Sequence, residues 1–213
     1  MKINIEILKQ ALVHNVSKIE NLNEKQLVKK MMVRRRLTRN SKILINLAYQ
    51  CEFLTGTMIY GSAYGEVLDT VSILNSINNN EAVSPTSFQN SVYNTAASYH
   101  SIIHVNKAEI LTLSCGDNTS YNVMQQAALS ACSNETVFAC VTEAINFEGV
   151  EQLNKCANEL EYGIAFKLKK TDDEATLHVD SIAQEGVPNS LAWMKSLYDV
   201  CANKEKCIFE IEL

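Results

Sequence analysis

Apolar and polar residues recur along this chain with two different periods. Residues 2–8 (KINIEIL) alternate, which fits a strand, although so short a run fits a short helix equally well. Residues 39–54 repeat their apolar positions every three to four residues, which predicts a buried helix. The run TGTMIYGS predicts a short strand, and EVLDTVSILNSI predicts a helix with these residues inside: Val67, Leu68, Val71, Leu74 and Ile77.

The middle of the chain predicts a strand–helix–strand unit. Residues 109–114 and 136–142 have the apolar composition of strands, and residues 119–131 between them have a helical pattern. A crossover of this kind joins neighbouring parallel strands. Before this unit, Ser84-Pro85-Thr86 predicts the start of a new segment, because proline suits a first helical turn or a loop. Residues 87–104 then predict a helix with core candidates Tyr99, Ile102 and Ile103.

The last third of the chain has a different pattern. Residues 162–169 and 175–179 predict a hairpin, residues 189–202 a helix, and residues 207–213 a closing strand. No composition shift marks a linker between domains. We therefore expect an α/β fold with a mixed sheet, in a single domain over residues 1–213.

Composition excludes several classes of protein. Hydrophobic residues make up 46% and charged residues 20% of the chain, an ordinary globular mixture. No apolar run reaches the length of a membrane span, and the charged N-terminus is unlike a signal peptide, so we expect a cytoplasmic protein. The cysteines include no CxxC pair, which favours reduced thiols over zinc ligands. They are Cys51, Cys115, Cys132, Cys140, Cys156, Cys201 and Cys207.

The charges are unevenly distributed. Residues 29–42 contain seven basic side chains and no acidic one, whereas the rest of the chain has 12 basic against 24 acidic residues, a net −12. This segment is either a solvated helix face or a binding site for an anionic partner. Nucleic acid is disfavoured, because the acidic body would repel it and few aromatic residues accompany the basic ones.

The turn after residues 109–114 is the main candidate for chemistry. A thiol at a helix N-terminus is favoured as thiolate, so Cys115 is a candidate nucleophile. Alternatively, Cys115 is the last buried residue of the strand, and the nearby Asp117 would disfavour the thiolate. His100 and His104 share one helix face and could supply a base. Their spacing could also bind a metal, but HExxH is absent and we expect no metal site.

Several sequence blocks between residues 34 and 144 resemble the N-terminal region of β-ketoacyl synthases. These blocks are RRRLTRNSK, GTMIYGSAYGEVLDT, SPTSFQNSVYNTAASYHSI and the strand–turn–helix at 109–131. The Ser-Pro-x-x-Phe block at 84–88 is the most specific of them, and VPNSLAW at 187–193 adds a weaker match near the end. The chain is most similar to the short, ketosynthase-like chain-length factors of type II polyketide and aryl polyene biosynthesis.

The resemblance implies a thiolase-like half-fold, with a mixed, mostly parallel sheet and helices on both faces. It also implies that the chain is not a condensing enzyme. Gly116 stands nearest the position of the family's catalytic cysteine, and Cys115 lies one residue early. Condensing enzymes take two histidines, or a histidine and an asparagine, from a C-terminal half that we expect this chain to lack. Without these groups most of the transition-state stabilisation is missing.

As a chain-length factor, the chain would pair with a full-length ketosynthase as a heterodimer, in polyketide, polyene or fatty-acid-like chain elongation. The resemblance places the partner interface on the strand before the turn, over Glu109, Ile110, Leu111, Thr112, Leu113 and Ser114. An uncovered apolar edge there would favour aggregation. Bulky side chains would limit the length of the acyl chain in a tunnel, with these candidates: Tyr93, Tyr99, Tyr121 and Met124.

The same resemblance gives the basic segment an acidic partner, the acyl carrier protein. Its docking candidates are Arg34, Arg35, Arg36 and Arg39, which could instead contact the ketosynthase. No cofactor is expected beyond the carrier's phosphopantetheine, which would deliver the acyl group. Two other functions stay open: a reduced thiolase-like acyltransferase that uses Cys115, with His100 or His104 as base, and a stand-alone module that binds acyl groups or carrier proteins.

Overall fold

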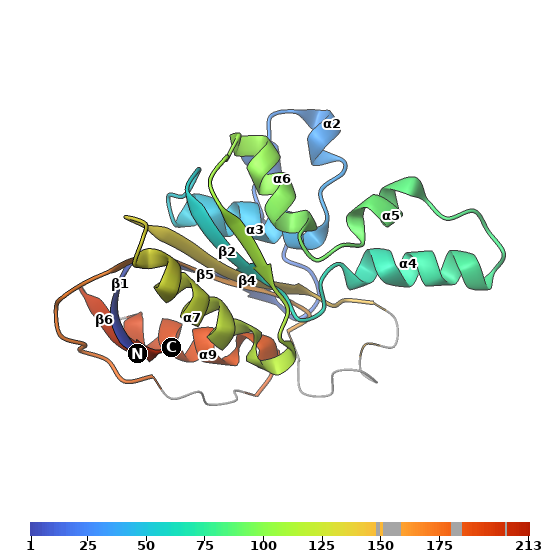
Figure 1. Ribbon diagram of the computed structural model, residues 1–213. Coiled ribbons are helices and arrows are strands. Elements are labelled where there is room, and N and C mark those ends of the chain that lie inside the picture. The colour runs from blue at the N-terminus through green and yellow to red at the C-terminus, as the bar shows by residue number, and fades with distance from the viewer. Residues whose placement is uncertain (148–149, 151–158, 180–184, 203) are drawn as a thin grey trace.

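The computed structural model describes residues 1–147, 150, 159–179, 185–202 and 204–213. In this part of the chain, six strands form one sheet in the order β3-β2-β4-β5-β1-β6 (Figure 1). Their bounds are β1 Lys2–Asn15, β2 Thr57–Gly61, β3 Ile110–Leu113, β4 Val137–Ala144, β5 Glu161–Lys170 and β6 Cys207–Glu212. The two chain ends lie together, and the Leu213 amide donates to the Met1 carbonyl at 2.8 Å.

One half of the sheet is parallel and the other half antiparallel. Strand β2 pairs in parallel with β3 and β4, so the two strands of the predicted strand–helix–strand unit are parallel, but β2 lies between them. The pairs β4–β5, β5–β1 and β1–β6 are antiparallel. The expected mixed α/β sheet is confirmed. Its parallel part is confined to β3-β2-β4, because β5 pairs with the outer side of β4 in the antiparallel direction.

Helices cover both faces of the sheet, as expected (Figure 1). Helices α7 (Thr119–Ala131) and α9 (Ala192–Cys201) lie on one face, and α3 (Arg39–Gln50) and α6 (Thr95–His104) on the other. Thr38 caps α3, because its side chain accepts the Ser41 amide at 3.1 Å. The remaining described elements are α1 (Glu24–Leu27), α2 (Met31–Arg34), α4 (Val67–Asn78), α5 (Pro85–Asn90), η1 (Gly116–Asn118) and η2 (Asn189–Leu191).

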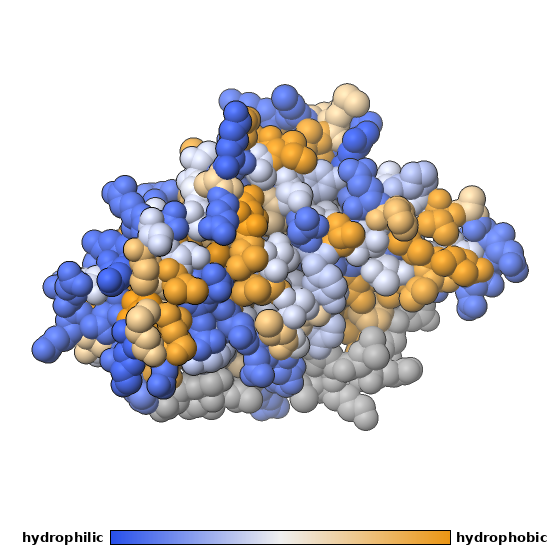
Figure 2. Space-filling model, in the orientation of Figure 1, coloured by the Kyte–Doolittle hydropathy of each residue, from blue (hydrophilic) through white to orange (hydrophobic). Residues whose placement is uncertain are grey.

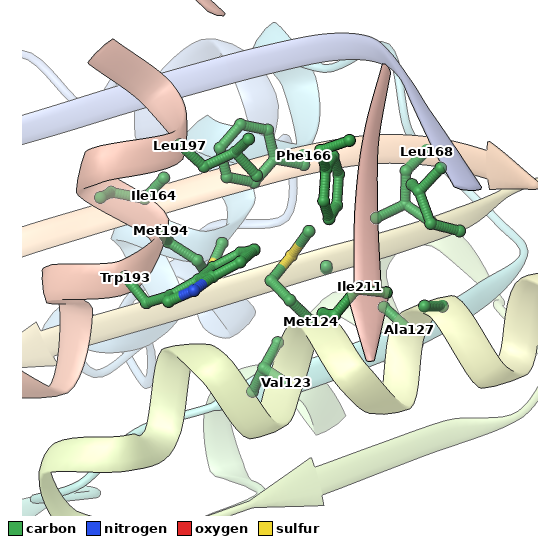
Figure 3. Packing of buried hydrophobic residues seen from close by; sticks show 14 of the residues in the cluster. Val123, Met124, Ala127, Ile164, Phe166, Leu168, Trp193, Met194, Leu197 and Ile211 are labelled. Carbon is green, nitrogen blue, oxygen red and sulfur yellow. The ribbon is translucent and has the colours of Figure 1, made fainter. Parts of the chain in front are cut away.

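The sheet has a hydrophobic core on each of its faces, because successive side chains of a strand point to opposite faces. On β5, Ile164, Phe166 and Leu168 face α7 and α9, whereas Ala165 faces α3. Figure 3 shows α7 placing Met124 against these β5 side chains and against α9. At Gly61, a Cβ would lie 2.5 Å from the Val123 side chain, so glycine lets the start of α7 approach β2.

Strand β1 settles the open choice at residues 2–8 in favour of a strand and extends it to Asn15. Three other elements differ from the sequence-based predictions. Within the described residues, segment 175–179 forms no hairpin with β5, which already has β1 and β4 on its two sides; Leu177 makes only a single parallel bridge to Phe209. The predicted helix 87–104 is two helices, α5 and α6, with Ser84 capping α5 and Pro85 in its first turn. Ile102 is 65% exposed, so its predicted core position is wrong.

The third difference is α4. Its bounds lie within one residue of those predicted, but it has no buried residue, and Leu74 and Ile77 are each 59% exposed. Helix α4 packs on α5, and the two project from the sheet as an arm (Figure 1). The described residues include no helix that is both long and apolar enough to cross a membrane.

Candidate functional site

The carboxyl ends of β2, β3 and β4 meet at one edge of the sheet. This edge is where ligands and reactive groups gather in open α/β sheets. The loop at 62–66 follows β2, the turn at 114–118 follows β3, and η2 lies next to η1. The Ser62 amide donates to the Leu113 carbonyl at 3.2 Å, which ties the first two connections together.

Glu143, near the end of β4, is the hydrogen-bonding centre of this edge. Its side chain is fully buried. Its Oε1 accepts the Ala63 amide at 2.6 Å and the Ser190 hydroxyl at 2.9 Å. Its Oε2 accepts the Ser62 hydroxyl at 2.9 Å and the Tyr64 amide at 3.3 Å. One carboxyl group therefore joins β4, the loop after β2 and the segment before α9.

Burial raises the pKa of Glu143 to about 7, although its four donors favour the charged form. Glu66, at the base of α4, is a second buried carboxyl, and burial raises its pKa to about 8. The Thr38 hydroxyl donates to Glu66 Oε1 at 2.7 Å. The loop between β2 and α4 is thus held at both ends by buried acids, which fixes the direction in which the arm leaves the sheet.

The turn after β3 presents Cys115 and Gly116 to solvent. Cys115 is exposed, so it is not the last buried residue of the strand. Its backbone amide donates to Thr119 Oγ1 at 3.0 Å, and that hydroxyl donates to the Gly116 carbonyl at 2.7 Å. Gly116 has a φ of +56°, a conformation that favours glycine, and a Cβ there would meet no atom within 4 Å.

The structure does not bring His100 or His104 to Cys115. His100 is fully buried and stacks on Phe53 with ring centroids 5.5 Å apart, before the start of β2. Both histidines therefore lie toward the amino ends of the strands, whereas Cys115 follows the carboxyl end of β3, roughly 13 Å away along the strand. Burial lowers the pKa of His100 to about 3 and also lowers that of His104. The predicted pairing with Cys115 as a base is wrong.

The other two histidines also lie away from the turn. His14 ends β1, where it stacks on Tyr162, four strand spacings or roughly 19 Å across the sheet from β3. His178 follows the Leu177 bridge to β6, at the opposite edge of the sheet. Among the described residues, no group of three or more His, Cys, Asp or Glu side chains could hold a metal ion.

The four acyl-tunnel candidates do not share one cavity. Met124 is fully buried in the core between α7 and the sheet (Figure 3), and half-buried Tyr121 packs against the same core. Tyr99 packs on the other face of the sheet with Ile45, and its hydroxyl donates to Asn90 Oδ1 at 3.2 Å. Tyr93 is 46% exposed beside Gly65. The expectation that all four line one tunnel is wrong, because the sheet separates Met124 and Tyr121 from Tyr99.

The four arginines predicted to dock the carrier protein lie in different environments. Arg39 forms an ion pair with buried Glu161 at the start of β5, so its predicted place on a docking surface is wrong. Arg34 donates to the Val28 carbonyl at 2.8 Å and is half-buried. Arg35 and Arg36 are exposed beyond α2 and stay available to a partner. The structure thus gives a smaller basic surface than the sequence suggested.

Strand β3 is an edge strand. In the described sheet it pairs only with β2, and its other side has no neighbouring strand. Its side chains are all half-buried, and Glu109 and Ser114 at its ends are exposed. The Glu109 and Leu113 carbonyls accept amides on the β2 side. Since alternate residues face opposite neighbours, the backbone groups of Ile110 and Thr112 point to the free side.

Sequence reasoning missed Glu143 and the Glu161 partner of Arg39. The signal for Glu143 is a single carboxylate at the end of an otherwise apolar strand, VFACVTEA. Such a residue, in a strand buried on both faces, indicates a buried acid that needs several donors. The donors themselves come from positions about 80 residues before and 47 residues after it.

Several solved structures have a similar fold. The fold is similar to a chain in the complex of the ketosynthase ApeO with its chain length factor ApeC from Xenorhabdus doucetiae, with a TM-score of 0.68 and 16% identity over 88% of each chain. It is also similar to the ishigamide ketosynthase/chain length factor, at 0.60 and 12%, over 80% of this chain and 63% of that one. A β-ketoacyl synthase from Burkholderia phymatum STM815 matches at 0.58 and 11%, over 80% and 60%.

No curated protein shows significant sequence similarity to the chain. The structural similarities lie between 11% and 16% identity and show the fold alone. The model of the β-ketoacyl synthase N-terminal domain, however, matches residues 12–206, which is most of the sequence. This range includes the buried acids, the exposed turn and the free edge of β3. The chain therefore belongs to the family of β-ketoacyl synthase N-terminal domains.

Proposed function

We propose that this protein is a non-catalytic subunit of the chain-length-factor type, which pairs with a full-length ketosynthase in polyketide, polyene or fatty-acid-like chain elongation. The free edge of β3 is the observation that carries the proposal. An edge with half-buried apolar side chains and outward backbone groups is a template for another strand. Pairing with the equivalent strand of a ketosynthase would continue the sheet across the interface.

The comparisons support a short partner subunit. The chain and its match in the ApeO–ApeC complex cover equal shares of each other, so they are of similar length. The chain spans only 63% and 60% of the other two matched chains. Membership of an aryl polyene pathway rests on the resemblance of the sequence blocks.

The geometry of the turn supports a non-catalytic role. Asp117 lies two positions after Cys115 in the same turn, and its carboxylate accepts a hydrogen bond from the Asn189 side chain at 3.3 Å. Each of the four histidines lies elsewhere in the fold. A cysteine nucleophile usually needs a neighbouring general base, and none of these histidines can act as one for Cys115. We therefore do not assign an acyltransferase reaction to Cys115.

Carrier-protein docking is a second part of the proposal. One solved structure with the same fold, at 10% identity, is a type II polyketide synthase acyl-carrier protein in complex with its ketosynthase. Exposed Arg35 and Arg36 lie in a segment without acidic residues, which suits an acidic protein. The acyl group would arrive on the carrier's phosphopantetheine, and this chain would need no cofactor of its own.

The test is co-expression with each full-length ketosynthase of the source organism, followed by light-scattering mass determination. We expect a one-to-one complex whose ketosynthase activity changes when this chain is omitted. Thr112→Pro removes an amide on the free side of β3 and leaves the β2 pairing intact, so it should abolish the complex. Thr112→Val keeps the amide and is the matched control. The proposal would be overturned if this chain bound none of the ketosynthases and Cys115 became acylated.

A further inference from the structure

Cys201 and Cys207 are two buried thiols that take no part in the candidate site. Cys201 is the last residue of α9 and Cys207 is the first residue of β6. Their side chains belong to the core that α7 and α9 form on one face of the sheet, and the two residues are only 3% and 5% exposed. Both thiols are free in the structure. What they can do depends on how closely they approach each other.

A tight turn between α9 and β6 brings the two cysteines together. The Lys204 amide donates to the Cys201 carbonyl at 3.1 Å, and the Cys207 thiol donates to the same oxygen at 3.6 Å. Burial raises the pKa of the Cys201 thiol, and so does its hydrogen bond with the Cys207 thiol. Cys207 therefore lies against both the carbonyl and the thiol of Cys201.

The place of the pair in the fold determines how an oxidant reaches it. Strand β6 is at an edge of the described sheet, and α9 ends at Cys201. By contrast, Cys140 lies in β4, which has a strand on each side, and Cys51 is fully buried beneath α3. The end of a helix and the start of an edge strand open locally at a lower free energy than the centre of a sheet. Cys201 and Cys207 are thus the buried thiols that meet solvent most readily.

We propose that Cys201 and Cys207 form a reversible disulfide when the folded protein meets a low-molecular-weight disulfide such as oxidised glutathione, and that this bond ties the end of α9 to the start of β6. The Cys207 thiolate attacks one sulfur of the oxidant, which forms a mixed disulfide and releases one glutathione thiolate. The Cys201 thiolate then attacks the Cys207 sulfur, so that the intramolecular bond forms and the second glutathione leaves. The two protein thiols give up two electrons and two protons, and the oxidant becomes two thiols.

Two physical effects act on this reaction. The second step is intramolecular and takes place between groups that already lie side by side, which makes the attack of Cys201 effective. Burial disfavours the thiolate, so the first step proceeds slowly, during local opening of the turn. Once formed, the bond closes the short loop between residues 201 and 207 and restricts the unfolded chain. We expect the oxidised protein to have a Tm about 4–8 °C higher than the reduced protein.

The disulfide lies away from the surfaces that concern the proposed function. Strands β6 and β3 are at opposite edges of the described sheet. The exposed hydrophobic residues that Figure 2 shows over α4 and α5 are also at the other end of the molecule from β6 (Figure 1). The inference therefore goes beyond the proposed function and holds or fails independently of it.

The experiment oxidises the folded protein in mixtures of reduced and oxidised glutathione and then unfolds it in N-ethylmaleimide, which blocks every free thiol. Lys204 and Lys206 lie between the two cysteines, so trypsin separates them and only a disulfide keeps their peptides joined. We expect mass spectrometry to find the joined peptides, and dithiothreitol to reverse both the link and the rise in Tm. Cys207→Ala should show neither effect. Cys132→Ala removes an exposed thiol, is the matched control, and should behave as wild type.

The decisive measurement is made on wild type, so it does not depend on how well a variant folds. If Cys201 and Cys207 both carry N-ethylmaleimide after oxidation, the pair does not form a disulfide and the inference fails. A link between Cys207 and a different cysteine would also overturn it. So would a Cys201–Cys207 link that appears only when oxidation is carried out in denaturant, because the folded structure would then not be what joins the two thiols.

Discussion

The guanidinium of Arg39 binds the buried carboxylate of Glu161 and thereby joins α3 to β5. Arg39 Nε donates to Glu161 Oε1 at 2.6 Å, and Nη2 donates to the other oxygen. The same carboxylate accepts the Ile19 amide at 2.7 Å, and Arg39 Nη2 donates to the Ile19 carbonyl at 3.0 Å. The pair therefore fixes the connection after β1, the start of α3 and the start of β5.

Loss of this arginine should destabilise the fold. Arg39→Ala leaves Glu161, which is 3% exposed, as an unpaired buried charge, and we expect a loss of about 3–5 kcal/mol in the free energy of unfolding. Arg36→Ala, at an exposed position, should change it by less than about 0.5 kcal/mol. Urea denaturation of both variants measures the difference. Equal effects would mean that Arg39 has no structural role.

Glu143→Gln should also destabilise the protein, by about 1–3 kcal/mol. Each carboxyl oxygen of Glu143 accepts a backbone amide, from Ala63 or from Tyr64. Whichever way the glutamine amide is turned, its NH₂ group faces one of these N–H donors and leaves it unsatisfied. Chemical denaturation at pH 6 would test this; stability equal to that of wild type would contradict the assigned contacts.

The pH dependence of stability follows from the same group. The pKa of Glu143 is raised to about 7 in the folded protein, so the folded state binds more protons than the unfolded state between about pH 4.5 and 7. Its contribution to stability is present below this range and is lost as pH rises through it. The difference between the wild-type and Glu143→Gln curves isolates this contribution, since His100 and Glu66 are common to both. A difference that does not vary between pH 5 and 8 would refute the raised pKa.

Alkylation should distinguish an ordinary Cys115 from an activated one. Cys115 and Cys132 are exposed, whereas Cys51, Cys140, Cys201 and Cys207 are buried. Iodoacetamide should label the first two in the native protein at comparable rates and the buried four only after unfolding, as measured by mass spectrometry. Cys115→Ala should leave the product of the ketosynthase complex unchanged. Labelling of Cys115 more than about tenfold faster than that of Cys132 would indicate an activated thiol.

Carrier-protein binding should depend on the exposed arginines. Arg35→Glu with Arg36→Glu should weaken binding of the acyl carrier protein to the complex and reduce its dependence on salt. Lys170→Glu with Lys204→Glu makes the same change in net charge at exposed positions elsewhere and is the control. Titration calorimetry at two ionic strengths measures both. Equal affinities for the two double variants would remove the docking site from residues 35 and 36.

Local periodicity in the sequence determined most elements and the α/β class. The predicted bounds of the helix at 119–131 are those of α7, and the strand–helix–strand unit correctly indicated that β3 and β4 are parallel. Such patterns succeed because a helix or strand buries one face of its own sequence. The same reasoning placed Leu74 and Ile77 in a core, since periodicity shows that a face is apolar but not what covers it.

Tertiary structure alone decided how distant residues meet. Arg39 finds Glu161 122 positions later, and the sheet divides Met124 from Tyr99 although both belong to helices of similar pattern. Strand β5 has β4 and β1 as neighbours instead of segment 175–179, because β1 lies between β5 and β6. The free edge of β3 and the projecting arm are likewise properties of strand order and packing. These long-range contacts depend on the whole fold, so no local pattern in the sequence encodes them.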